Sequence, residues 1–200
     1  MPGNKPKPAP RAELPMLGFA NPAAWRAWLA AHHAAAPGLW MKIGKQSANA
    51  PSITYAEALE AALCYGWIDG QKKGLDETAW LQKFTPRGPK SIWSQINRDK
   101  AEALIAAGQM QPAGLAAVEA AKADGRWAAA YAGAKQMGVP PDLQTELDRY
   151  PEAQAFFAKL NSTNRYAILF RLATAKKAET RARRLQQFVQ MLRRGEKLYP

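Results

Sequence analysis

Apolar residues recur at helical spacing along most of the chain, and the first such stretch begins at a strong start signal. Asn21 is a preferred residue for capping a helix N-terminus, and Pro22 suits the first helical position. Trp25, Trp28 and Leu29 then fall on one helical face. The pattern predicts a helix that packs an aromatic stripe against the core.

A second helix has two well-marked ends. Thr54 and Glu57 have the spacing of a capping box, in which each side chain bonds the other residue's backbone amide. The apolar stripe then continues to Gly66, and glycine commonly ends helices. Later stripes predict further helices at residues 91–108, 112–124, 126–132, 141–150, 151–160, 162–175 and 177–194.

Strand-like alternation is confined to the region between residues 39 and 84. Residues 67–73 and 78–84 read as the two strands of a hairpin, joined by a turn at residues 74–77. Residues 39–45 add a short third strand. The predicted fold class is α+β: a small antiparallel sheet packed by helices, followed by a helical C-terminal half.

Changes in composition suggest three segments. Residues 1–20 are rich in proline and lysine, which predicts a flexible arm. Residues 21–110 form the predicted α+β domain with the central motif. Residues 111–200 form a helical region that we expect to pack on the same core. A polar, turn-rich loop is expected at residues 44–51.

Composition narrows the classes of function. The 200 residues carry a formal net charge of +12 and are 48% hydrophobic, so we expect a folded protein with an acidic partner. Cys64 is the single cysteine, which excludes an internal disulfide and a cysteine-based metal site, and no cofactor is indicated. No apolar run reaches the length of a membrane span, and no export signal is recognisable, so a cytoplasmic location is expected.

The hairpin carries the candidate ligand site. Strand alternation places Trp67, Asp69 and Lys73 on one open face. Together with Arg87 and Trp93 they predict a groove for a small anionic ligand or an acidic protein segment. The two tryptophans would form its wall, Lys73 and Arg87 would supply positive charge, and Asp69 would orient the ligand. If the protein is an enzyme, Asp69 is the candidate acid or base.

Two basic features extend this prediction. Arg87 and Lys90 precede a helix start capped by Ser91 or Ser94, where free amides and the helix dipole favour an anion. No phosphate-loop pattern of glycine, lysine and threonine accompanies them. The last helix has an apolar stripe and a basic remainder that predicts contact with nucleic acid or an acidic partner, through Arg181, Arg183, Arg184, Arg193 and Arg194.

Three motifs resemble one known family. They are residues 51–73, residues 84–87 with 91–97, and residues 175–184. They are similar to the YdeI/OmpD-associated family, also called the bacteriocin-protection or OmdA family, and the resemblance extends over residues 25–196. It implies a role in protection against bacteriocins or cationic peptides and an association with an outer-membrane porin. It implies no reaction and no catalytic residues.

The sequence therefore favours a non-enzymatic, cytoplasmic stress-protection protein that binds a small anionic ligand or an acidic partner. Two alternatives stay open. One is an enzyme that uses Asp69 as its acid or base, and the other is a nucleic-acid-binding protein that uses the C-terminal arginines. No metal site is expected.

Overall fold

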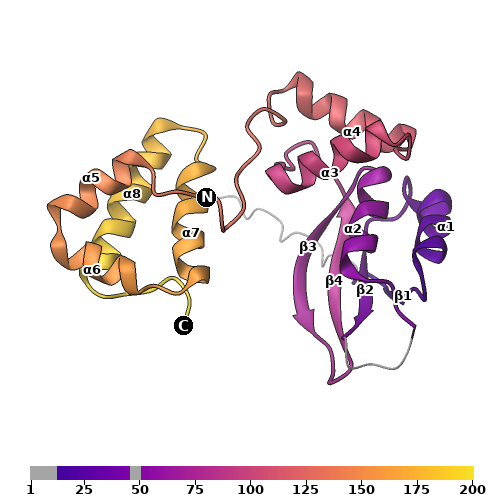
Figure 1. The fold of residues 1–200 in the computed structure, drawn as a ribbon, viewed down its shortest axis with the longest axis horizontal. Helices are drawn as coiled ribbons and strands as arrows, with labels where there is room; N and C mark the ends of the chain where they lie inside the picture. The colour runs from indigo at the N-terminus through magenta and orange to yellow at the C-terminus, as the bar shows by residue number, and fades with distance from the viewer. Residues whose placement is uncertain (1–12, 46–50) are drawn as a thin grey trace, which may run out of the picture. The chain divides into compact units, whose positions relative to one another are not determined.

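The chain divides into two compact units in a computed structural model that describes residues 13–45 and 51–200 (Figure 1). The sheet unit comprises Met1–Ser91 and Asp99–Gly125, and the helical unit comprises Ile92–Arg98 and Arg126–Pro200. Residues 1–12 of the predicted arm and 46–50 of the predicted loop lie outside the described residues.

The sheet unit contains a four-stranded sheet in the order β1-β2-β4-β3. Strand β4 pairs antiparallel with both β2 and β3, whereas β1 pairs parallel with β2. The α+β fold is confirmed, with β1 as an addition that the sequence did not predict because it is only three residues long. Residues 16–18 fall within the segment predicted as a flexible arm, and that prediction is wrong for them because they pair with β2. The strands are β1 (Met16–Gly18), β2 (Leu39–Gly44), β3 (Trp67–Gly74) and β4 (Ala79–Pro86).

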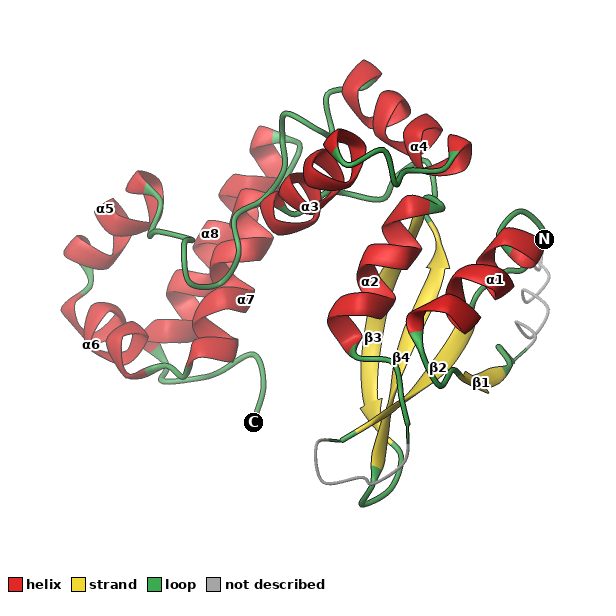
Figure 2. Cartoon of the chain, turned by 45° about the vertical axis from the view of Figure 1, so that its right-hand side comes forward, coloured by secondary structure: helices red, strands yellow, loops and turns green. Residues whose placement is uncertain are grey.

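Helices α1 (Pro22–His32) and α2 (Tyr55–Cys64) lie on the same face of this sheet (Figure 2). Their predicted caps are confirmed, because the Asn21 side chain accepts a bond from the amide of Ala24 and Thr54 forms a complete capping box with Glu57. The core beneath them combines aliphatic side chains with the rings of Trp67 and Phe84, and Trp25 is fully buried in it.

Helix α4 (Pro112–Ala123) packs closely against the end of α2. The amide of Gln111 donates a 3.0 Å hydrogen bond to the carbonyl oxygen of Cys64. Gly66 ends α2 with a φ of +72°, a conformation that side chains with a Cβ rarely adopt. Gly114 is buried directly against the Cys64 carbonyl, so the two backbones approach more closely than any side chain would permit.

The helical unit is built around α5 (Pro141–Arg149), α6 (Pro151–Lys159), α7 (Ser162–Ala173) and α8 (Ala178–Arg193), as Figure 1 shows. All four helices were predicted, and the apolar stripe of α8 is confirmed by the burial of Phe188, Val189 and Leu192. The Asn161 side chain caps α7 by accepting a bond from the amide of Asn164.

Asn164 also fixes the C-terminal tail of the helical unit. Its side-chain oxygen accepts 3.0 Å bonds from the amides of Leu198 and Tyr199, and its nitrogen donates a 3.2 Å bond to the Tyr199 carbonyl. Only 1% of the residue is exposed. A buried amide with its donors and acceptors satisfied in this way holds the tail in one register.

One predicted helix start and one predicted helix are corrected by the structure. Of the two predicted caps of α3 (Gln95–Ala106), Ser94 is confirmed, because its side chain accepts the bond from the amide of Asn97; the helix therefore begins after Ile92 and Trp93 rather than before them. The first turn of α3 belongs to the helical unit and the rest to the sheet unit. The short helix predicted at residues 126–132 is absent: this segment forms turns, and the Tyr131 amide bonds the Trp93 carbonyl instead.

Candidate functional site

A β-bulge in β3 determines which side chains share a face of the sheet. Asp69 pairs with Phe84 and Lys72 pairs with Gln82, so Gly70 and Gln71 together lie opposite the single residue between those partners. The side-chain amide of the buried residue Gln82 donates bonds of 2.9 Å and 3.3 Å to the carbonyls of Gly70 and Gln71. These bonds hold the extra residue in place.

The bulge reverses the alternation expected beyond Asp69. Lys72 now faces the side covered by the helices, where its Nζ lies 4.1 Å from the centre of the Trp80 ring. Lys73 faces the opposite side, with its Nζ 4.1 Å from the centre of the Trp40 ring. The prediction that Asp69 and Lys73 share a face is therefore wrong, since one extra residue moves every later side chain to the other face.

The expectation that Trp67 lines an open face is also wrong. Only 1% of Trp67 is exposed, and its indole nitrogen donates a 3.1 Å bond to the carbonyl of His33. Trp93 is equally buried, and its ring centre lies 4.8 Å from that of Trp127 in the helical unit. Both tryptophans are core residues of their own units and form no wall of a solvent-filled groove.

Lys72 lies at a hollow of about 560 Å³ in the sheet unit, which we call the Lys72 hollow. Two aromatic residues line it: Trp80 and Tyr55, whose ring centres are 6.1 Å apart. Two lysines contribute charge, because Lys45 lines the hollow beside Lys72. The full lining is Ile43, Gly44, Lys45, Thr54, Tyr55, Lys72, Gly74 and Trp80.

Asp69 lies beside Tyr55 but is not one of the described residues that line the hollow. Its Oδ2 accepts a 2.8 Å hydrogen bond from the Tyr55 hydroxyl. This bond fixes the orientation of Tyr55. Roles for Asp69 in orienting a ligand and in catalysis stay predictions.

Arg87 belongs to the sheet unit, whereas Ser94 and the first turn of α3 belong to the helical unit. The Arg87 amide donates a 2.9 Å bond to the carbonyl of Gly66, which ties the end of β4 to the end of α2. Ligand binding by Arg87, and its cooperation with a helix N-terminus, stay predictions.

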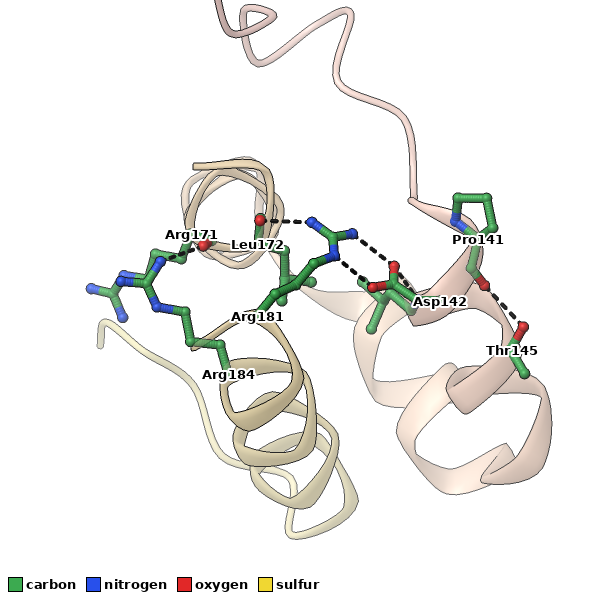
Figure 3. Close-up of polar contacts among 8 residues, drawn as sticks. Pro141, Asp142, Thr145, Arg171, Leu172, Arg181 and Arg184 are labelled. Carbon is green, nitrogen blue, oxygen red and sulfur yellow. Dashed lines mark hydrogen bonds and ion pairs between the residues drawn. The ribbon is translucent and has the colours of Figure 1, made fainter. Parts of the chain in front are cut away.

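Two of the five predicted partner-binding arginines hold the helical unit together (Figure 3). Arg181 donates through Nε and Nη2 to the two carboxylate oxygens of Asp142, at 2.7 Å and 2.8 Å, and through Nη1 to the Leu172 carbonyl at 2.7 Å. Arg184 donates a 2.6 Å bond to the Arg171 carbonyl. These bonds join α8 to α5 and to the end of α7.

The remaining three arginines differ in how they are engaged. Arg193 donates to Glu152 at 2.9 Å and lies over the Tyr150 ring, and Arg194 donates two 2.9 Å bonds to Glu196. Arg183 is exposed and makes no hydrogen bond or ion pair with the part of the chain that the structure describes. It is the one of the five whose charge is not directed at a described neighbour.

Other reactive groups have unremarkable surroundings. Cys64 is completely buried, and this burial raises the pKa of its thiol, which keeps it protonated and unreactive.

Within residues 13–45 and 51–200, no cluster of three histidine, cysteine or acidic side chains suits a metal ion. In the same residues, no helix is both long enough and apolar enough to cross a membrane.

The bulge can be tested by replacing Gln82 with alanine. This change leaves the carbonyls of Gly70 and Gln71 without their buried donor, so we expect a loss of about 1.5 kcal/mol of stability. Urea unfolding measures the loss, and hydrogen exchange should increase in β3. Gln71→Ala, on an exposed side chain, is the control. Equal stability of the two variants would show that Gln82 does not hold the bulge.

Comparisons with known proteins match the two parts of the chain to different family models. Residues 136–195 match the family described as bacteriocin-protection, YdeI or OmpD-associated (OmdA), so the predicted family is confirmed there. The motifs at residues 51–73 and 84–97 lie instead within residues 17–117, which match a domain of unknown function, DUF8412. No curated protein and no solved structure matches the chain. The chain belongs to the DUF8412 family, whose model matches residues 17–117, and its residues 136–195 match the OmdA family model.

Proposed function

We propose that this is a non-enzymatic, cytoplasmic protection protein that binds a small anionic ligand in the Lys72 hollow. The observation that supports this most directly is the composition of that hollow. Its described lining contains two lysines and no carboxylate, beside the rings of Tyr55 and Trp80. The bacteriocin-protection domain in residues 136–195 supports the protective role.

The geometry favours a flat organic anion over a compact one. The Lys72 ammonium contacts the Trp80 ring and makes no ion pair with the described residues, so its charge is available to a carboxylate or phosphate. Tyr55 is 37% exposed, and its ring presents an apolar surface at the same hollow. An anion with an aromatic or apolar body would satisfy both features, as is usual for small-molecule sites.

Binding is tested with benzoate as the probe, since it combines a carboxylate with a flat ring. We expect benzoate to raise the melting temperature of the wild type, because a ligand that binds only the folded state stabilises it by mass action. Lys72→Gln should abolish the increase. Lys73→Gln is the matched control, because it removes the same charge from the opposite face, and it should behave like the wild type.

Two results would argue against this site. The first is an equal loss of the benzoate response in both lysine variants, which would indicate a general charge effect. The second is a full response in Lys72→Gln, which would place the anion elsewhere. Inorganic phosphate, run in parallel, separates recognition of the ring from recognition of charge alone.

The protective role is tested in cells that lack the protein. Survival during exposure to a cationic bacteriocin should be restored by the wild type and by Lys73→Gln, and only weakly by Lys72→Gln. All three proteins must be present at equal levels, which immunoblotting establishes. Equal survival with the two variants would show that protection does not depend on the Lys72 hollow.

A further inference from the structure

The helical unit contains a groove of about 680 Å³ along α8, distinct from the Lys72 hollow. Glu146, Arg149 and Tyr150 form one side, at the end of α5 and the start of α6. The α8 side consists of Ala182, Arg183, Leu185, Gln186, Gln187, Val189, Gln190 and Arg194. We call this the α5–α8 groove.

The charge of the groove is positive. Three arginines line it against one carboxylate, that of Glu146. Glu146 accepts a 3.0 Å bond from Arg149, and Arg194 is paired with Glu196, so both of those arginines are already partly neutralised. Arg183 is exposed and not paired with any described residue. Its guanidinium is therefore the main unneutralised charge of the groove.

The uncharged lining suits a polypeptide. Gln186, Gln187 and Gln190 are exposed, and their side chains make no hydrogen bond with the described residues. A glutamine amide both donates and accepts, which matches the alternating amides and carbonyls of an extended peptide. Leu185, which is half-buried, offers apolar surface between these polar groups.

We infer that the α5–α8 groove binds an acidic segment of a partner protein, in extended conformation. Charge complementarity with Arg183 would orient the segment, and the glutamine side chains would bond its backbone. From residue 182 to residue 194 the helix rises about 18 Å, which accommodates about five or six extended residues. This inference does not depend on the Lys72 hollow.

Other occupants fit the groove less well. Residues 1–12 of this chain contain three basic residues and no acidic one, so the groove would repel them. Tyr150 is the groove's aromatic residue, and the Arg193 guanidinium lies 4.2 Å from its ring centre. A ring covered in this way offers no platform for stacking nucleic-acid bases.

The test is a fluorescence-anisotropy titration of the full-length protein with a short labelled peptide of alternating glutamate and leucine. We expect binding that weakens as salt rises, and no binding of the same peptide with lysine in place of glutamate. Arg183→Glu should weaken binding at least about tenfold, the effect of about 1.4 kcal/mol. Lys159→Glu, an equal change of charge on an exposed residue outside the groove, should weaken it less than about twofold.

Four results would overturn the inference. They are wild-type affinity in Arg183→Glu, equal weakening in Lys159→Glu, displacement of the peptide by a single-stranded oligonucleotide that binds more tightly, and self-association that Arg183→Glu abolishes. The last two would assign the groove to nucleic acid or to a second copy of the chain. An unchanged melting temperature of Arg183→Glu excludes loss of folding as the cause of weaker binding. Gln190→Ala serves as a second, milder variant.

Discussion

Replacing Gly114 by alanine is expected to destabilise the sheet unit by about 3 kcal/mol, the upper end for overpacked positions. A Cβ at this position would overlap the carbonyl group of Cys64 and approach the Met110 Cε within 2.8 Å. The methionine side chain can move, but the carbonyl belongs to the last turn of α2 and cannot. Relief therefore requires α4 to separate from α2.

Urea unfolding with hydrogen exchange at α2 and α4 measures this loss. Gly18→Ala is the control in the same unit, because the nearest atom to its added Cβ is the Lys42 Cβ at an ordinary 3.8 Å. Its stability should stay within about 0.5 kcal/mol of the wild type. A stable Gly114→Ala variant would contradict the close packing of α4 on α2.

Replacing Arg181 by alanine should destabilise the helical unit by about 2 kcal/mol. The change removes two bonds to Asp142 and one to the Leu172 carbonyl, and bonds that involve charged groups are among the stronger ones. The expected loss of stability is moderate because the side chains of Arg181 and Asp142 are 31% and 36% exposed, so solvent weakens their attraction.

The matched control is Arg183→Ala, two residues further along the same helix. It removes an equal charge with no bond to the described residues, so stability should change by less than about 0.5 kcal/mol. Denaturant unfolding of both variants makes the comparison. If they lose equal stability, the role assigned to Arg181 is contradicted.

The Arg181–Asp142 pair also makes stability depend on pH. The hydrogen bond from Arg181 lowers the pKa of the Asp142 carboxyl below its ordinary value of about 4. A lowered folded-state pKa adds stability that is complete above the ordinary value and is lost as the pH falls through the folded-state value. Asp142→Asn should remove this part of the acid sensitivity, which unfolding experiments across the acidic range would detect.

Much of the fold follows from local signals in the sequence. Asn21, Thr54 and Gly66 mark helix ends through bonds or backbone angles that involve only a few neighbouring residues. Short-range chemistry of this kind is readable without a structure. Residues 126–132 show where local signals fail, because their helical spacing is overridden by the backbone bonds that Tyr131 makes with Trp93 and Gln95.

The candidate site could not be predicted from local signals, because it depends on a β-bulge that is held by a residue of the neighbouring strand. Strand alternation assigned Lys73 to the face of Asp69, and the bulge at Gly70 and Gln71 gives that place to Lys72. A glycine inside a strand is a known signal of a bulge, but its position is fixed by Gln82 on the neighbouring strand. The sequence therefore missed Tyr55, Lys72 and Trp80 as neighbours.

The different roles of the α8 arginines also could not be predicted from the sequence. Their spacing predicts a basic helix, but it does not distinguish Arg181, which bonds Asp142, from Arg183, which faces no described acidic group. Asp142 is far from them in the sequence. Only the packing of α5 on α8 separates structural arginines from those available to a partner.

The most direct test of anion binding in the Lys72 hollow is to observe which tryptophan signal responds to the anion. Trp80 and Trp40 lie on opposite faces of the sheet, beside Lys72 and Lys73 respectively. Nuclear magnetic resonance spectra of the indole N–H groups can follow both during a titration with benzoate. Anion binding in the Lys72 hollow predicts a shift of the Trp80 signal that Lys72→Gln abolishes, with the Trp40 signal unchanged. A shift of Trp40 without one of Trp80 would contradict it.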